Sequence, residues 1–346
     1  MKSKIFSEGG PYNIRETEQD RYSLTVPLPP GEDGRVAREC PDKNCSPGYF
    51  KVKPGTGITE QVQAFCPYCR KTAEPSAFTS EEQIRYAIDV LGREAHDGIN
   101  KMVAEALGIG LSGKRTLADG LIKVEMTLTT PSKPLVRAPF EDEVRRDVIC
   151  PKCSLDHSVY GLATWCPDCG TDIFLTHVEA EFGVVGLMLS DIERRRALLG
   201  RRVAAKDLEN CLEDTVSIFE TVLRIMARRR KAENNETHQA IDEFFRRTGN
   251  AFQNVRRASE IYVQEFHAAL LDNLKREDIE ALVTIFEKRH PITHNLGVVD
   301  KKYLERVRSA EEEGRDVLVT KEEIMKADRL SLEVFRSIHE RLFPVP

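Results

Sequence analysis

The chain has 346 residues, of which 40% are hydrophobic and 31% charged, and its formal net charge is −5. This length is sufficient for two or three domains that each bury a core, and the composition is typical of a globular protein. The negative net charge argues against a protein that coats nucleic acid through bulk positive charge, so any contact with nucleic acid must be local.

The start of the chain and its apolar runs bear on where the protein acts. The first residues, MKSKIFSEGGPYNI, contain no apolar segment typical of a secretory signal. The longest apolar run, residues 182–189, is far too short to span a bilayer. We therefore expect a cytoplasmic protein with no membrane partner. In that compartment, nine cysteines favour metal ligation over disulfide bonds.

Eight of the nine cysteines form two sets of four in the first half of the chain. Each set supplies two short turns with two thiolates apiece, as a closed tetrahedral Zn²⁺ site requires. Pro67, Pro151 and Pro167 directly follow cysteines, and proline favours the tight turns that aim two sulfurs at one ion. The sets are Cys40, Cys45, Cys66 and Cys69, then Cys150, Cys153, Cys166 and Cys169.

Both sets resemble zinc ribbons, in which the cysteine-bearing turns of a β-hairpin unit share one metal ion. Strand-like segments separate or flank these turns, at 49–52 and 62–65 in the first set and at 159–162 and 173–175 in the second. We expect two structural zinc ions and no catalytic metal, because four cysteines leave no open coordination position. The turns could in principle be exchanged between the sets. Nearby lysines and arginines could contact phosphates or only solvent.

A helix is predicted between the two ribbons. It starts at a capping box in residues 79–82, and Ile84 and Ile88 begin its apolar stripe. The glycines of 108–114 resemble a nucleotide-binding loop, but they end a helix instead of joining a strand to one, so we interpret them as an exit loop. Residues 122–128 alternate apolar and polar side chains, which predicts a strand before a proline-rich linker.

From about Gly183 onward the hydrophobic pattern is helical almost throughout. The ninth cysteine, Cys211, shares the apolar face of a long helix and is expected to be a small core residue. The sequence therefore predicts an α+β multidomain protein with two small β zinc ribbons, a linking helix and strand, and an all-α bundle. The predicted boundaries are an unassigned segment at 1–32, a first ribbon at 33–78, the linking region at 79–143, a second ribbon at 144–179 and the bundle at 180–346.

One segment of the helical half places a permanent positive charge close to a titratable ring. Arg289 precedes His294 by five positions, with His290 between them and Asn295 directly after. A guanidinium can hold a phosphate, and an imidazole can move a proton near neutral pH without a metal. With this many arginines and histidines, such a spacing should arise by chance roughly twice, so the context must support the interpretation.

That context resembles the HEPN superfamily, compact helical bundles found in RNA-cleaving toxins, phage-defence proteins and transferase-associated modules. The resemblance covers roughly residues 183–342 and is most specific at 252–254, 286–290 and 299–304. The family motif is an arginine, a polar residue, a short spacer and a histidine. Arg289, His290 and His294 fill these positions here.

The resemblance implies a metal-independent endoribonuclease with RNA as its substrate. It assigns proton transfer to His294, phosphate binding to Arg289, and substrate orientation or hydrogen bonding to His290 and Asn295. On a straight helix the motif's arginine and second histidine lie about 140° apart, and Pro291 disturbs the helix between them. We therefore expect a homodimer, formed through the helical bundle, whose two copies share a site.

By analogy with the family, the protein is expected to be a toxin or an antiphage-defence effector, kept silent by an antitoxin or sensor protein. The main alternative is a non-catalytic module whose ribbons and bundle bind nucleic acid or a protein. A metal-dependent nuclease or deaminase is a third class, but no spare set of histidine, aspartate and glutamate ligands supports it.

Overall fold

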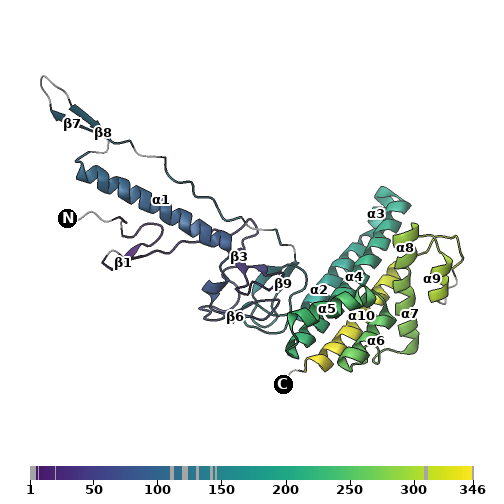
Figure 1. Ribbon diagram of the computed structural model, residues 1–346. Helices are drawn as coiled ribbons and strands as arrows, with labels where there is room; N and C mark the ends of the chain where they lie inside the picture. The colour runs from purple at the N-terminus through teal and green to yellow at the C-terminus, as the bar shows by residue number, and fades with distance from the viewer. Residues whose placement is uncertain are drawn as a thin grey trace. The chain divides into compact units, whose positions relative to one another are not determined.

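A computed structural model shows two compact units, Met1–Asp172 and Ile173–Pro346 (Figure 1). The first contains small antiparallel sheets and one long helix, and the second is mostly helical, which confirms the predicted α+β class. No helix in the described part of the chain is long and apolar enough to cross a membrane. The structure describes all residues except 1–4, 7, 20, 110–112, 119–123, 130–131, 141–142, 145, 308–310 and 345–346.

The first unit contains a four-stranded antiparallel sheet, called the central sheet below, in the order β3 (Val36–Glu39), β4 (Tyr49–Val52), β10 (Asp156–Val159) and β9 (Arg146–Ile149). Each outer strand forms a hairpin with its inner neighbour, and a cysteine-bearing turn joins the two strands of each hairpin. The inner strands β4 and β10 pair with each other, so segments about a hundred positions apart share one sheet.

Four segments around the cysteine turns were predicted to be strands, and the structure confirms these predictions to different extents. Residues 49–52 are β4 as predicted, whereas the segment 62–65 shortens to β5 (Ala64–Phe65), which pairs with β6 (Thr72–Ala73). Of 159–162, only the first residue lies in β10. The prediction of a strand at 173–175 is wrong, because Phe174 begins helix α2 and is buried with other apolar residues of that helix.

The linking helix α1 (Glu81–Ala106) follows a short 3-10 helix, η1 (Pro75–Phe78). A capping box is present one position later than predicted, with Ser80 and Gln83, in place of Thr79 and Glu82, exchanging hydrogen bonds. The buried residues of α1 are Gln83 and Val90, whereas the stripe that begins with Ile84 faces outward.

Two further hairpins complete this unit, and neither belongs to the central sheet. One pairs β1 (Arg15–Glu18) with β2 (Arg21–Ser23), and the other pairs β7 (Lys114–Ala118) with β8 (Val124–Thr127). The second hairpin confirms most of the strand expected at 122–128. The first residues of that strand, and three glycine-loop residues at 110–112, lie outside the described part of the chain.

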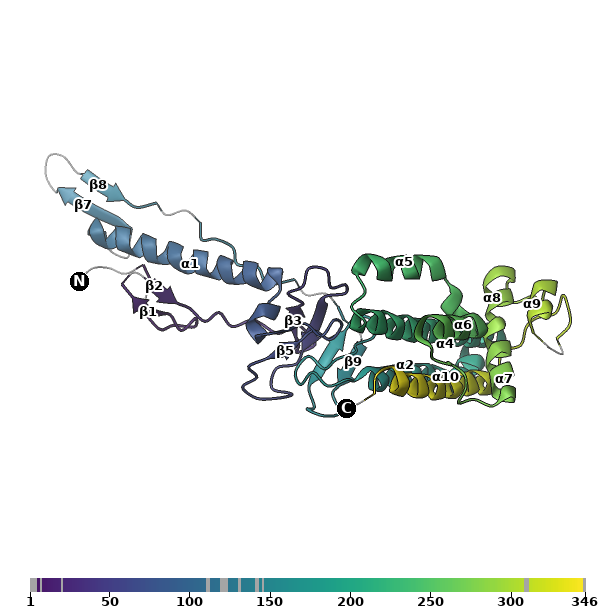
Figure 2. The same ribbon diagram turned by 60° about the horizontal axis from the view of Figure 1, so that its bottom comes forward.

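The second unit packs three long helices together, with shorter helices around them (Figure 2). Phe219 lies at the centre, with its ring centroid 5.3 Å from that of Phe335 and 5.0 Å from that of Phe286. Cys211 is fully buried in this core, as expected. The helices are α2 (Phe174–Ser190), α3 (Ile192–Leu199), α4 (Arg201–Glu233), α5 (His238–Thr248), η2 (Ala251–Gln253), α6 (Val255–Phe266), α7 (Arg276–Glu287), α8 (Arg289–Asn295), α9 (Lys301–Arg306) and α10 (Lys321–Leu342).

Candidate functional site

The Arg–His motif occupies the short helix α8, which follows α7 after a single residue. Pro291 explains the break for two reasons. Its ring clashes with the backbone carbonyl of the residue four positions earlier, and its nitrogen has no hydrogen to donate to that carbonyl. That residue is Glu287, the last of α7. Lys288 lies at the junction with its ammonium buried, donating hydrogen bonds to Leu318 O and to the Glu323 carboxylate. The motif is therefore held at a fixed helix junction.

A cavity of about 430 Å³ lies where α6, α7 and α8 approach each other, and the motif contributes Arg289 and His290 to its wall. The 3-10 turn η2 and the start of α6 supply Gln253, Asn254 and Arg257, and α9 supplies Arg306. The structure thus brings together two of the segments that the family resemblance singled out separately, 252–254 and 286–290.

Arg289 is held in the wall of the cavity by a chain of hydrogen bonds. Its guanidinium donates to Gln253 Oε1, and Gln253 Nε2 donates to Glu220 Oε2 at 2.6 Å. Glu220 lies on α4, so the chain connects the motif to the longest helix of the unit. A guanidinium held by one neutral partner keeps further N–H donors available for a ligand.

Glu287 organises another part of the cavity wall. Its side chain is only 11% exposed, and its two oxygens accept from Asn254 Nδ2 at 2.7 Å and from Arg306 Nη1 at 3.1 Å. The same asparagine caps α6, because its Oδ1 accepts from Arg257 N at 3.0 Å. This arrangement fixes both the carboxylate and the first turn of α6.

The positive charge of the cavity is only partly neutralised. Arg257 is exposed, and it forms no ion pair with any carboxylate that the structure describes. The N-terminus of α6, a helix of 12 residues, also lines the cavity and carries the positive end of the helix dipole. Two guanidiniums and a helix N-terminus form an arrangement suited to a phosphate group.

His290 is the titratable ring of the cavity. Burial, together with the positive charges of Arg306 and Lys302, lowers the pKa of His290, and Asp300 partly opposes this shift. The His290 Nε2 atom lies 3.8 Å from Asp300 Oδ2. The ring is therefore favoured in its neutral form, which can accept a proton near neutral pH.

The other two predicted site residues lie outside the cavity wall. His294 is exposed, and its ring centroid lies 5.0 Å from that of His290. Asn295 is also exposed and donates to Val298 O at 2.8 Å, which closes the end of α8. One chain therefore presents Arg289 and His290 to the cavity, with His294 beside them on the outer side.

Several cavity residues had no role in the sequence-based prediction. Gln253, Asn254 and Glu287 fall within the segments that carry the resemblance, and this was the available signal. Arg257 and Arg306 lacked such a signal, because arginines are common throughout this half of the chain. Their role depends on helix packing that sequence spacing does not reveal.

The two cysteine sets lie in the first unit, and each could hold one metal ion. Within each set the four sulfurs lie within 4.8 Å of one another, in the grouping that the sequence predicts. Four of these sulfur–sulfur separations are 3.6 Å for Cys40–Cys69, 3.7 Å for Cys45–Cys66, 3.7 Å for Cys150–Cys169 and 3.5 Å for Cys153–Cys166. Sulfurs placed tetrahedrally about 2.3 Å from Zn²⁺ would lie about 3.8 Å apart, so both sets fit that ion.

Comparison of the chain with protein-family models, with curated proteins and with solved structures gave no match.

Proposed function

We propose that the chain is a metal-independent endoribonuclease of HEPN type, which cleaves RNA at the cavity bounded by α6 and α8. The observation that carries this proposal is the presence of Arg289, Arg257 and the neutral-favouring ring of His290 in one cavity wall. Phosphate binding and proton transfer are the two requirements of RNA cleavage by attack of the 2′-hydroxyl on the adjacent phosphate.

The residues divide this chemistry between them. Arg289 and Arg257 would bind the scissile phosphate and stabilise the negative charge that grows on its oxygens. His290 would take the proton of the 2′-hydroxyl, because burial and nearby cations favour its neutral form. His294 would give a proton to the departing 5′-oxygen, and Asn295 would hydrogen-bond the substrate.

The exposed position of His294 supports a site completed by a second copy of the chain. A second copy facing α8 would place its own His294 and Asn295 opposite the cavity of the first copy. This twofold arrangement would bring both proton-transfer rings to one phosphate. A monomeric species with full ribonuclease activity would contradict it.

The metal ions and the biological role complete the proposal. Each cysteine set would hold a structural zinc ion, which stabilises a small unit that cannot build a large core. A role as a toxin or antiphage effector, regulated by an antitoxin or sensor protein, rests on analogy alone. The alternative, a module that binds RNA or protein without cleaving it, predicts binding with no turnover.

Point variants test the enzymatic proposal. Replacing Arg289, His290 or His294 with Ala should each reduce cleavage of labelled RNA by about 100-fold or more, because each variant removes a charge-stabilising or proton-transfer group. His238→Ala is the matched control, since His238 is an exposed ring on α5 outside the cavity. Cleavage that survives unchanged in the three variants would refute the assignment, and RNA binding without cleavage in the wild type would favour the alternative.

A further inference from the structure

The two cysteine sets are joined through the backbone of the central sheet. β4 belongs to the first set and β10 to the second, and they pair with Lys51 opposite Ser158 and Phe50 opposite Val159. Both residues of the latter pair are buried to 1% exposure or less, so the strands meet in a packed core. A strand that becomes more or less ordered therefore directly affects the conformation of the other strand.

The ligand-bearing turns also bond each other in a reciprocal pattern. Phe65 N donates to Pro167 O at 2.8 Å, and Trp165 N donates to Pro67 O at 3.0 Å. The two donors directly precede the ligands Cys66 and Cys166, and the two acceptors directly follow those ligands. The turns of the first set, or first half of this metal-binding region, and those of the second set, its second half, therefore bond each other in the same way. Each turn is held by a backbone carbonyl of the other.

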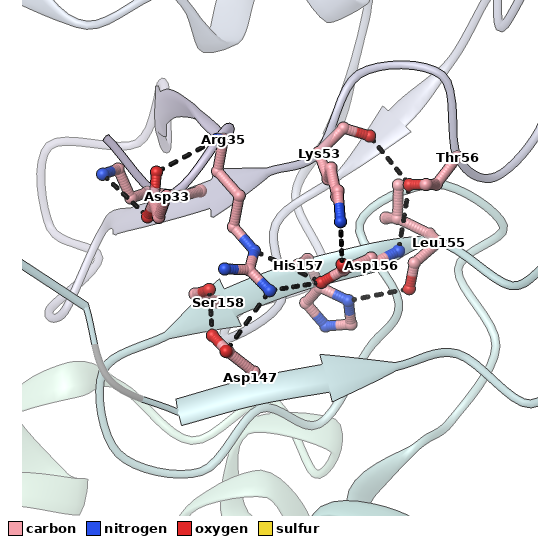
Figure 3. Close-up of polar contacts among 10 residues, drawn as sticks. Asp33, Arg35, Lys53, Thr56, Asp147, Leu155, Asp156, His157 and Ser158 are labelled. Carbon is pink, nitrogen blue, oxygen red and sulfur yellow. Dashed lines mark hydrogen bonds and ion pairs between the residues drawn. The ribbon is translucent and has the colours of Figure 1, made fainter. Parts of the chain in front are cut away.

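Polar side chains fasten the same boundary (Figure 3). Arg35, next to β3, reaches across the sheet, with its Nη2 atom 2.6 Å from Asp156 Oδ1 and 3.3 Å from Asp147 Oδ2. Its side chain is only 11% exposed. From the loop after β4, Ile58 N donates to the carboxylate of Asp168, which lies between two ligands of the second set. The first half therefore contacts the second both at the sheet and at its metal-binding turn.

We propose that the two cysteine sets form one coupled metal-binding unit, in which an ion bound at either set raises the affinity of the other. A metal ion orders the two turns that ligate it, and binding then provides folding free energy. Because each set's turns and strands are partly held by the other set, ordering one reduces the ordering cost of the other. The coupling requires no contact between the two ions.

Partial loading of the wild-type chain tests this coupling without reference to RNA cleavage. The chain is stripped of metal under reducing conditions, given one equivalent of Zn²⁺ and analysed by native mass spectrometry. Two independent sites leave at least about half of the chains singly loaded at half saturation, whereas a tenfold coupling between equal sites reduces this fraction to about a quarter. We expect the metal-free and two-ion species to predominate. A singly loaded fraction of one half or more would overturn the proposal.

A variant that spares all eight ligands tests the path of the coupling. Arg35→Met removes the two ion pairs of Arg35 with Asp156 and Asp147, leaves that of Lys53 with Asp156, and should raise the singly loaded fraction. Arg85→Met makes the same change of charge on α1, where the arginine pairs with Glu82 of the same helix, and should leave the fraction unchanged. Equal fractions in the two variants would overturn the assignment of coupling to this boundary. Far-ultraviolet circular dichroism of both variants verifies that the helices remain folded.

Discussion

At the scale of single residues, the cavity depends on side chains that hold other side chains. Arg289 is positioned by Gln253, which is in turn positioned by Glu220 on α4. Glu287 performs a similar task for Asn254 and Arg306. These contacts hold the guanidiniums of Arg289 and Arg306 in the wall of the cavity, while His294 and Asn295 remain at the surface.

The buried carboxyl group of Asp328 gives the helical unit a dependence on pH. Burial raises the pKa of Asp328 to about 7, from the ordinary value of 3.8 for an aspartate, and the hydrogen bond from Thr215 opposes this shift. The folded state therefore binds the proton more tightly than the unfolded state between these two values. The free energy of unfolding should fall as pH rises from about 4 to about 7, by up to about 4 kcal/mol.

Asp328→Asn should remove this contribution, because the amide stays neutral and its oxygen still accepts from Thr215. Urea unfolding followed by helical circular dichroism at pH 5 and pH 8 measures the effect. We expect a smaller loss of stability between these pH values than in the wild type. Asp242→Asn, at a largely exposed site on α5, is the control and should keep the wild-type dependence. An unchanged dependence in Asp328→Asn would contradict the account.

At the scale of elements, the cysteine turns pack closely enough that a single methyl group should disturb them. Gly170 has a φ of +62°, and a Cβ atom there would lie 2.9 Å from the ring of Phe65 in the other half. Gly161 has a nearly equal φ of +60°, with no atom within 4 Å of the same position. The two glycines share the backbone constraint and differ in the contact.

Gly170→Ala should therefore lose more stability than Gly161→Ala, by about 1–3 kcal/mol, the usual cost of overpacking. Thermal unfolding of the metal-loaded chain, with zinc release detected by a colorimetric chelator, measures both variants. Equal losses would show that the φ constraint alone is responsible and that the turns do not pack as described.

Local signals in the sequence predicted several elements well. The cysteine sets, the strand at 49–52 and, to within one residue, the capping box of α1 are each encoded within a few residues, by ligand spacing, strand-forming side chains or a hydroxyl three positions before an acceptor. The prediction of a strand at 173–175 was wrong, because a short apolar run is compatible both with a strand and with the start of a buried helix.

Contacts between segments far apart in the sequence could not be predicted from such local signals. The pairing of β4 with β10 joins residues about a hundred positions apart, and the sequence of neither strand indicates which strand it pairs with. The same limit applies to the cavity. Spacing along one helix indicates that Arg289 and His294 diverge, but only the packing of η2 and α9 near α8 brings Gln253 and Arg306 to the motif.

At the scale of the whole chain, the two units have separate tasks in this account. The first unit would use two metal ions to hold a coupled sheet, and the second would supply the RNA-cleaving cavity. The two proposals are independent, because metal loading is measured by mass and cleavage by RNA products. Either can fail while the other stands.

The most direct test of the central claim is the chemistry of the RNA ends. Attack by a 2′-hydroxyl leaves a 2′,3′-cyclic phosphate and a free 5′-hydroxyl, and a 2′-deoxy nucleotide at the cleavage position blocks it. The wild-type chain is incubated with labelled RNA and EDTA, and its bound metal is measured before and after. We expect cleavage with these ends, lost on deoxy substitution and in His290→Ala. Products with 5′-phosphate ends, cleavage that requires added Mg²⁺, or intact RNA would contradict the account.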